Sequence, residues 1–190
     1  MRTRLLLATG NPGKVAEIST ILEGFEVVPR PAHLPEPVED GDTLLDNARI
    51  KARALVDATG EPAIADDTGL EVVALGGAPG VMTARYAGED ATYEDNWRKL
   101  LRELGDQADR RAQWRTIALL HRPDGTEVWA EGTCDGTITW EARGEHGFGY
   151  DPVFVPDEGD GRTFAELAID EKNALSHRGR AFRTLGALLT

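Results

Sequence analysis

The alternation of apolar and polar stretches predicts that strands and helices follow one another through the first third of the chain. Short apolar runs bounded by turn residues indicate buried strands, and apolar residues spaced by three or four indicate amphipathic helices. Thr43 and Asp46 resemble a capping box at the start of a helix, and Gly60 follows its end. The predicted elements are strands at 5–9 and 26–29, a proline-rich extended loop at 29–37, and helices at 13–23 and 43–58.

Strand patterns become more frequent in the rest of the chain. A polar stretch, Asp66 to Gly69, follows a short apolar run, so we expect the two acidic residues at the carboxyl end of a strand. Strands mixed with helices, some joined by hairpins, imply an α/β fold with a mixed sheet. The predicted elements are strands at 63–65, 111–121, 126–134 and 136–140, a strand or short helix at 70–75, a helix at 92–104, a glycine-rich loop at 144–154 that enters a strand, and a helical tail at 170–189.

Length and composition favour one soluble domain that covers residues 1–190. The apolar runs are too short to span a membrane or to form a signal sequence, so we expect a cytoplasmic protein. The one cysteine, Cys134, excludes an internal disulfide framework. A formal charge of −12 disfavours a nucleic-acid partner, but it is compatible with one small anionic ligand, provided that cations gather locally or a metal ion mediates.

The first strand leads into Thr-Gly-Asn-Pro-Gly-Lys, residues 9–14, directly before a predicted helix. Backbone N–H groups at a helix N-terminus, with Lys14 in the first turn, favour a bound anion. The spacing of Gly10 and Gly13 is not that of a Walker A loop, and Val15 stands where that loop has its Ser or Thr. An ordinary strand-to-helix turn is the alternative, since Asn, Pro and Gly are good turn residues.

Asp66 and Asp67 are the most informative polar pair. Adjacent carboxylates at a strand end repel each other unless a cation or hydrogen bond stabilises them, and a metal ion with phosphate oxygens would do so. The alternative, a turn with a helix cap, needs only one Asp. A second acidic group precedes the helix at 43–58, and one of its members could reach a shared metal while the others stay solvated. Its members are Glu39, Asp40, Asp42 and Asp46.

Two later segments carry further candidate residues. Phe148 and Tyr150 stand on either side of Gly149 in a glycine-rich loop, and aromatic side chains in such a loop can stack on a nucleobase or, alternatively, plug the core. Lys172, His177 and Arg178 are hydrogen-bond donors near the start of the last helix, where the alternative is a solvated face.

Together these segments resemble the inosine/xanthosine triphosphate pyrophosphatase family. The matching stretches, in the family's order, are ATGNPGKVAEI, DTLLDNARIKARAL, ADDTGLEVVALGGAPGVMTARYAGEDA, GFGYDPVF and EKNALSHRGRAF. The resemblance implies hydrolysis of ITP, dITP and XTP to the monophosphate and pyrophosphate, which removes non-standard purines from the nucleotide pool. It also implies Mg²⁺, a homodimer and an elongated α/β fold, with a long central mixed, twisted sheet flanked by helices and two lobes around a substrate cleft.

The resemblance also implies roles for individual residues. Asp67 would be the general base and, with Glu39, a metal carboxylate, while an acid next to Glu39 stays an alternative; Lys51 would act on the triphosphate at the catalytic centre. Thr68 stands where the family usually has serine. The implied substrate-binding residues are Thr9, Gly10, Asn11, Pro12, Gly13, Lys14, Thr68, Phe148, Gly149, Tyr150, Asp151, Lys172, His177 and Arg178.

Three other functions stay open at this point. A pyrophosphatase for a different modified nucleotide would carry the same phosphate chemistry. A regulatory module that binds nucleotides without hydrolysis is disfavoured, because a pure binder gains little from two acids beside phosphates. A nucleic-acid protein is disfavoured by the charge of −12.

Overall fold

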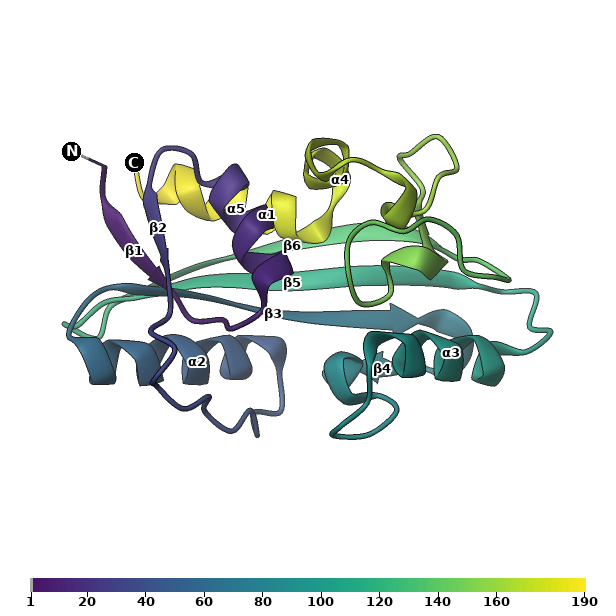
Figure 1. The fold of residues 1–190 in the computed structure, drawn as a ribbon, viewed down its shortest axis with the longest axis horizontal. Helices are drawn as coiled ribbons and strands as arrows, with labels where there is room; N and C mark the ends of the chain where they lie inside the picture. Colours follow the sequence, from purple (N-terminus) through teal and green to yellow (C-terminus); the bar gives the residue numbers. More distant parts are fainter. Residues whose placement is uncertain (1) are drawn as a thin grey trace. The chain divides into compact units, whose positions relative to one another are not determined.

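The computed structural model describes residues 2–190, which form a mixed α/β fold around one seven-stranded sheet. The strand order is β2-β1-β3-β5-β6-β7, and β4 pairs with β3 (Figure 1). Strand β1 is parallel to β2 and β3, whereas the pairs β3–β4 and β6–β7 are antiparallel. The strands are β1 (Arg4–Leu7), β2 (Glu26–Pro29), β3 (Ala63–Val72), β4 (Pro79–Gly80), β5 (Arg111–His121), β6 (Glu127–Ile138) and β7 (Phe154–Pro156). The predicted α/β class with a mixed sheet and flanking helices is confirmed.

Five α-helices and four short 3₁₀ helices complete the described chain, residues 2–190. The α-helices are α1 (Pro12–Ile21), α2 (Leu44–Thr59), α3 (Tyr93–Leu104), α4 (Ile169–Leu175) and α5 (His177–Leu188). The 3₁₀ helices are η1 (Val73–Leu75), η2 (Thr83–Arg85), η3 (Asp151–Val153) and η4 (Phe164–Glu166). Helix α2 begins where the sequence predicts, because Thr43 accepts a hydrogen bond from the amide of Asp46, and it ends at Gly60 in a left-handed conformation.

The chain divides into two compact units. The first contains the chain up to Asp67 together with residues 116–132 and 177–190, and the second contains residues 68–115 and 133–176. Strands β3, β5 and β6 contribute residues to both units. The prediction of one domain over 1–190 stays a prediction.

In the first unit, the alternation of side chains along β1 and β3 creates a core on each face of the sheet. Leu5, Leu7 and Ile64 point to one face, where they pack with apolar residues of α1 and α5. Leu6 and Ala65 point to the other face and pack with α2. Figure 1 shows α1 and α5 on one side of these strands and α2 on the opposite side.

The second unit has a core of its own that is rich in aromatic rings. Trp114 contacts Tyr150 and Phe154 edge-on, and Phe154 contacts Phe164 with ring centroids 5.1 Å apart. At the start of α3, Thr92 and Asp95 form the capping box that the sequence pattern indicates.

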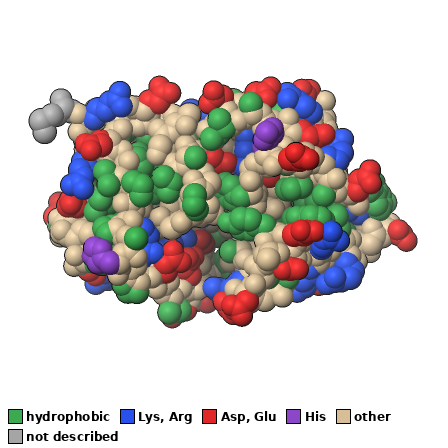
Figure 2. All heavy atoms as spheres, viewed as in Figure 1, with side chains coloured by type: hydrophobic (Ala, Val, Ile, Leu, Met, Phe, Trp, Pro, Cys, Tyr) green, Lys and Arg blue, Asp and Glu red, His purple; other side chains and the backbone are tan. Residues whose placement is uncertain are grey.

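Charged side chains of both signs are interspersed on the face drawn in Figure 2. Within residues 2–190, no helix has the length and apolar character that a bilayer span requires.

The prediction that the chain leaves the strand at Asp66 is wrong, because β3 continues without a break through Asp66, Asp67, Thr68 and Gly69. Aspartate and glycine are poor strand residues, but cations from other elements stabilise the two carboxylates in the strand. Two smaller differences concern the extent of other elements. Strand β6 joins the two strands predicted around Cys134, and the helical tail is divided into α4 and α5 at Ser176.

Candidate active site

Asp66 and Asp67 lie next to each other in β3, and their side chains point to opposite faces of the sheet because successive residues of a strand alternate. Asp66 shares the face of α1 and α5, and Asp67 shares the face of α2. Because the two carboxylates point away from each other, the repulsion expected between adjacent carboxylates at a strand end is reduced. The two carboxylates have different hydrogen-bonded cations: Lys14 and Arg178 for Asp66, and Lys51 for Asp67.

On the α2 face, Lys51 connects two carboxylates. Its Nζ donates to Asp67 Oδ1 at 2.7 Å and to Glu39 Oε2 at 3.0 Å. Burial raises the pKa of Asp67 above its ordinary value, although the nearby ammonium of Lys51 opposes the shift. Burial would lower the pKa of Lys51, but attraction to Asp67, Asp66 and Glu39 outweighs it, so the pKa of Lys51 is raised. The site therefore holds an ammonium ion directly against a carboxylate with increased basicity.

On the opposite face, Asp66 connects α1 with α5. Lys14 Nζ lies 3.2 and 3.1 Å from the two oxygens of Asp66, while Arg178 donates to Asp66 Oδ2 from Nε at 3.2 Å and from Nη2 at 3.3 Å. The remaining Nη1 of Arg178 donates to Glu17 Oε2 at 2.7 Å. These four residues form a charge chain that is buried except for the partly exposed Lys14: Glu17, Arg178, Asp66 and Lys14. Two negative and two positive charges alternate along it.

The charges of this charge chain and its burial shift the pKa values of Asp66 and Lys14. Burial alone would raise the pKa of Asp66, but Lys14 and Arg178 outweigh it and hold this pKa well below its ordinary value. Burial lowers the pKa of Lys14, and attraction to Asp66 offsets only part of that effect. A bound phosphate would add negative charge near Lys14 and so favour its protonated form.

The loop before α1 is held by its own side chains. Asn11 is the N-cap of α1 and accepts hydrogen bonds from the amides of Gly13 at 2.9 Å and Lys14 at 3.4 Å. Thr9 Oγ1 accepts from the amide of Asn11, and Pro12 occupies the first helical turn, where a missing N–H is harmless. The loop is thus a capped helix N-terminus with the Lys14 side chain directed to Asp66.

The start of α5 is placed by a close approach to β6. A Cβ at Gly132 would lie 2.2 Å from the carbonyl oxygen of His177 and 2.4 Å from the amide of Ala181, so only glycine permits this approach. His177 and Arg178 are both buried at this N-terminus.

The second unit contains the other predicted group, the loop at 147–151 with Lys172. Asp151 Oδ2 accepts from the amide of Phe148 at 2.8 Å and from Lys172 Nζ at 2.5 Å. Lys172 Nζ also lies over the Phe148 ring, 4.8 Å from its centroid. The hydroxyl of Tyr150 donates to the carbonyl of Thr83, and burial raises the pKa of Tyr150. Asp151 therefore organises the loop, and the half-buried Phe148 ring is the part that remains partly accessible.

The predicted residues belong to both units. The group in the first unit contains Thr9 to Lys14, Glu39, Lys51, Asp67, His177 and Arg178, and the group in the second contains Phe148 to Asp151 and Lys172. Thr68 belongs to the second unit and follows Asp67 in β3.

Sequence reasoning missed two polar residues, Glu17 and Asn47, and also the contact of Asp66 with Arg178. Asn47 Nδ2 lies 3.4 Å from Asp67 Oδ2. Glu17 stands one helical turn after Lys14, but a buried glutamate on a helix has the same sequence pattern as a solvated one.

The acidic residues before α2 differ in their contacts. Glu39 reaches Lys51, whereas Asp46 accepts from Thr43 at 2.6 Å and from Arg49 at 3.3 Å. Asp40 and Asp42 are exposed.

A metal ion would have to fit a small donor set. Among residues 2–190, no group of three or more His, Cys, Asp or Glu side chains is arranged to hold one. However, Glu39 and Asp67 each place an oxygen within 3.0 Å of the same Lys51 ammonium, so they converge on one cation. Mg²⁺ is usually bound by one or two carboxylates together with water and substrate phosphates, and this pair fits that requirement.

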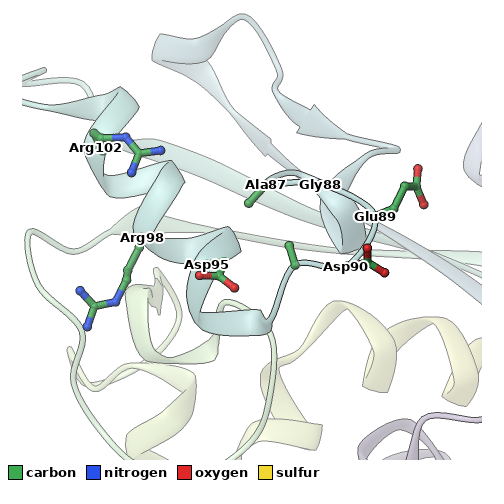
Figure 3. Close-up of a pocket in the computed structure, with 8 residues that line it drawn as sticks. Ala87, Gly88, Glu89, Asp90, Asp95, Arg98 and Arg102 are labelled. Carbon is green, nitrogen blue, oxygen red and sulfur yellow. The ribbon is translucent and has the colours of Figure 1, made fainter.

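A hollow of about 550 Å³ beside α3 contains none of the predicted residues (Figure 3). Its charged side chains are Glu89, Asp90, Asp95, Arg98 and Arg102. Asp95 is engaged in the capping box with Thr92, and Arg98 pairs with Glu94 one turn away. We assign these contacts to the stability of α3.

The model of the Ham1 family matches residues 5–188, and the chain belongs to this family. Relatives named dITP/XTP pyrophosphatase are similar over almost the whole sequence. The protein of Caulobacter vibrioides is 47% identical over 193 residues, which cover 100% of this chain and 99% of the relative. That of Streptomyces coelicolor is 47% identical over 194 residues, which cover 96% of this chain and 95% of the relative.

Solved structures show the same fold. The Ham1 protein of Coxiella burnetii matches with a TM-score of 0.88 and 40% identity, and that of Staphylococcus aureus with 0.86 and 38%; each match covers 98% of both chains. A protein of Mycobacterium abscessus, titled nucleoside-triphosphatase / dITP/XTP pyrophosphatase, matches with a TM-score of 0.75 and 44% identity over 98% of this chain and 99% of its own.

Proposed function

We propose that this protein hydrolyses non-standard purine nucleoside triphosphates, namely ITP, dITP and XTP, to the monophosphate and pyrophosphate. Membership of the Ham1 family and relatives named dITP/XTP pyrophosphatase over nearly the full chain support this activity. The observation that carries it is the contact of Asp67 with Lys51, because it places a base of increased basicity against an ammonium ion.

Cleavage of the bond between the α- and β-phosphates needs an attacking water, a base for its proton, and charge relief for the departing pyrophosphate. Asp67 is the proposed base, since a carboxylate with a raised pKa accepts a proton more readily. Lys51 and Lys14 are the proposed phosphate partners. Residues Thr9 to Lys14 would position the triphosphate. Its phosphate oxygens would accept hydrogen bonds from backbone amides of this loop, including the amides of Gly13 and Lys14 that now donate to the Asn11 side chain.

Mg²⁺ is the proposed metal, held by Glu39 and Asp67. When bound, it would orient or acidify water and neutralise phosphate charge. Lys51 lies against both carboxylates and would keep them close together while the phosphates enter.

Base recognition is proposed for Phe148, Lys172 and His177. A ring such as Phe148 can stack on a purine, and a donor aimed at the purine O6 accepts hypoxanthine and xanthine but leaves the amino group of adenine without a partner. We place Arg178 in a different role from the one that the resemblance implies. Its Nε, Nη1 and Nη2 donate to Asp66 and Glu17, so it positions Asp66 and, through it, Lys14.

Dimerisation and a cytoplasmic location are proposed from the same family resemblance. Val73, Val81 and Met82 of the second unit are exposed apolar side chains that would suit a subunit contact.

The test is a substrate panel of ITP, XTP, GTP, ATP and pyrimidine triphosphates, scored for pyrophosphate and orthophosphate. We expect pyrophosphate from ITP and XTP. Replacement of Asp67 by Asn should lower turnover by roughly 10²- to 10⁴-fold, the usual contribution of a general base. Asp57→Asn, at an exposed position of α2, is the matched control. Orthophosphate as the direct product would contradict the proposed cleavage, and binding without turnover would support a sensor instead.

A further inference from the structure

Asn47 lies on α2, one turn before Lys51, and is only 3% exposed. Its side-chain amide makes one contact at each end. Oδ1 accepts a hydrogen bond from the amide of Gly41 at 2.9 Å, and Nδ2 donates to Asp67 Oδ2 at 3.4 Å. This arrangement defines the orientation of the amide, because the oxygen must face an N–H donor and the nitrogen must face a carboxylate.

The loop before α2 approaches the helix closely at Gly41. A Cβ at this position would lie 2.7 Å from Asn47 Oδ1 and 2.7 Å from Asp46 Cβ. Any other residue at position 41 would therefore push the loop away from the first turn of α2. Glu39 stands two residues earlier in the same loop and reaches Lys51 at 3.0 Å.

The carboxylate of Asp67 is held at both oxygens by neighbouring turns of α2. Lys51 donates to Oδ1 and Asn47 to Oδ2, which together restrict rotation of the carboxylate plane. The same Asn47 side chain holds the loop that carries Glu39. One buried amide thus connects the two proposed metal carboxylates through a backbone contact and a side-chain contact.

We propose that Asn47 is a positioning residue, which fixes the Glu39 loop and the plane of the Asp67 carboxylate relative to each other. This inference rests on the proposed function, because it gives the two carboxylates a common task. Misplacement of a catalytic group by about 1 Å can lower a rate by about 10²-fold. The latch formed by Asn47 and Gly41 therefore acts on turnover more than on phosphate binding, because the proposed phosphate partners are other residues, Lys51 and the loop that ends at Lys14.

The chain offers a matched control in Asn96 of α3. Asn96 is 1% exposed, accepts from the amide of Ala87 at 2.7 Å and donates to the carbonyl of Ala84 at 3.0 Å. Asn96→Ala thus removes the same kind of buried amide, with one accepted and one donated hydrogen bond, from the second unit. It reports the effect of lost stability alone.

The experiment compares Asn47→Ala, Gly41→Ala, the double variant and Asn96→Ala. Hydrogen exchange of the segment 38–43 is measured on the metal-free protein, and kcat and KM are measured with ITP and Mg²⁺. We expect faster exchange in Asn47→Ala by roughly 2- to 10-fold, as the loss of one hydrogen bond implies. We also expect kcat to fall by about 10- to 100-fold, with KM changed by less than about 3-fold. Gly41→Ala should show the same faster exchange and the same fall in kcat. The fall in kcat of the double variant should be little larger than that of either single variant.

Asn47→Asp separates the two contacts, because it keeps an oxygen for the amide of Gly41 but places a second carboxylate against Asp67. Slow exchange should be retained while kcat falls. A kcat of Asn47→Ala that equals that of Asn96→Ala, or additive losses in the double variant, would overturn the proposal. If the wild-type protein does not hydrolyse ITP, the proposed function and the catalytic role of Asn47 both fail, and the exchange rates still decide whether the latch exists.

Discussion

Replacement of Arg178 by Met tests the charge chain of Glu17, Arg178, Asp66 and Lys14. The substitution removes one of the two positive charges. It leaves Glu17 without its arginine and Asp66 with Lys14 alone, and both carboxylates are at most 3% exposed. Removing one partner of a buried ion pair typically destabilises a protein by about 3–5 kcal/mol, since the other charge stays desolvated. We expect the free energy of unfolding to fall by that amount at neutral pH.

Thermal unfolding measures this change directly. For a protein of this size, 1 kcal/mol corresponds to roughly 2–4 °C in Tm, so Arg178→Met should lower Tm by roughly 6–20 °C. Arg183→Met is the control, because Arg183 is an exposed residue of the same helix, and such a change usually stays within about 0.5 kcal/mol.

A second substitution makes the test more specific. Glu17→Gln in the Arg178→Met background restores equal numbers of positive and negative charges, so Tm should rise above that of the single variant. If Arg178→Met matches the control, or if the double variant is less stable than Arg178→Met alone, the charge chain does not stabilise the fold as argued.

The boundaries of several elements could be predicted because local signals and tertiary packing agree. Thr43 and Thr92 cap α2 and α3 as their sequence patterns indicate, and the strand predicted at 26–29 is β2. The apolar run at Leu5, Leu6 and Leu7 predicts only a buried strand, and the division of these residues between two cores follows from strand geometry in the structure.

The path of the chain through Asp66 and Asp67 could not be predicted from local signals. Two aspartates, a threonine and a glycine have the composition of a turn, and they form a strand only because distant cations stabilise the carboxylates. Lys14 and Lys51 belong to different helices, so their arrangement on opposite faces is a property of the tertiary fold. Glu17 is a similar case, since a buried glutamate on a helix has the same sequence pattern as a solvated one.

Two further substitutions test the loop in the second unit and the acid stability of the first. Gly147 has φ +75°, and an added Cβ would lie 2.0 Å from Asp151 Oδ2, so Gly147→Ala should raise KM for ITP. The control is Gly161→Ala, since Gly161 has a similar φ of +89° and an added Cβ there meets no atom within 4 Å; its KM should change far less. Equal KM values would show that Asp151 does not organise the loop. The pKa of Asp66 lies below its ordinary value of 3.8. Burial alone would raise this pKa, but nearby cations, and Lys14 most of all, outweigh the effect of burial. The stabilising contribution of Asp66 is therefore complete above about pH 4 and is lost as the pH falls towards the pKa of the folded state. Chemical unfolding between pH 6 and pH 2 should show a shallower loss of stability in Asp66→Asn than in the wild type, and parallel curves would mean that the carboxylate of Asp66 gains nothing from its cations in the folded protein.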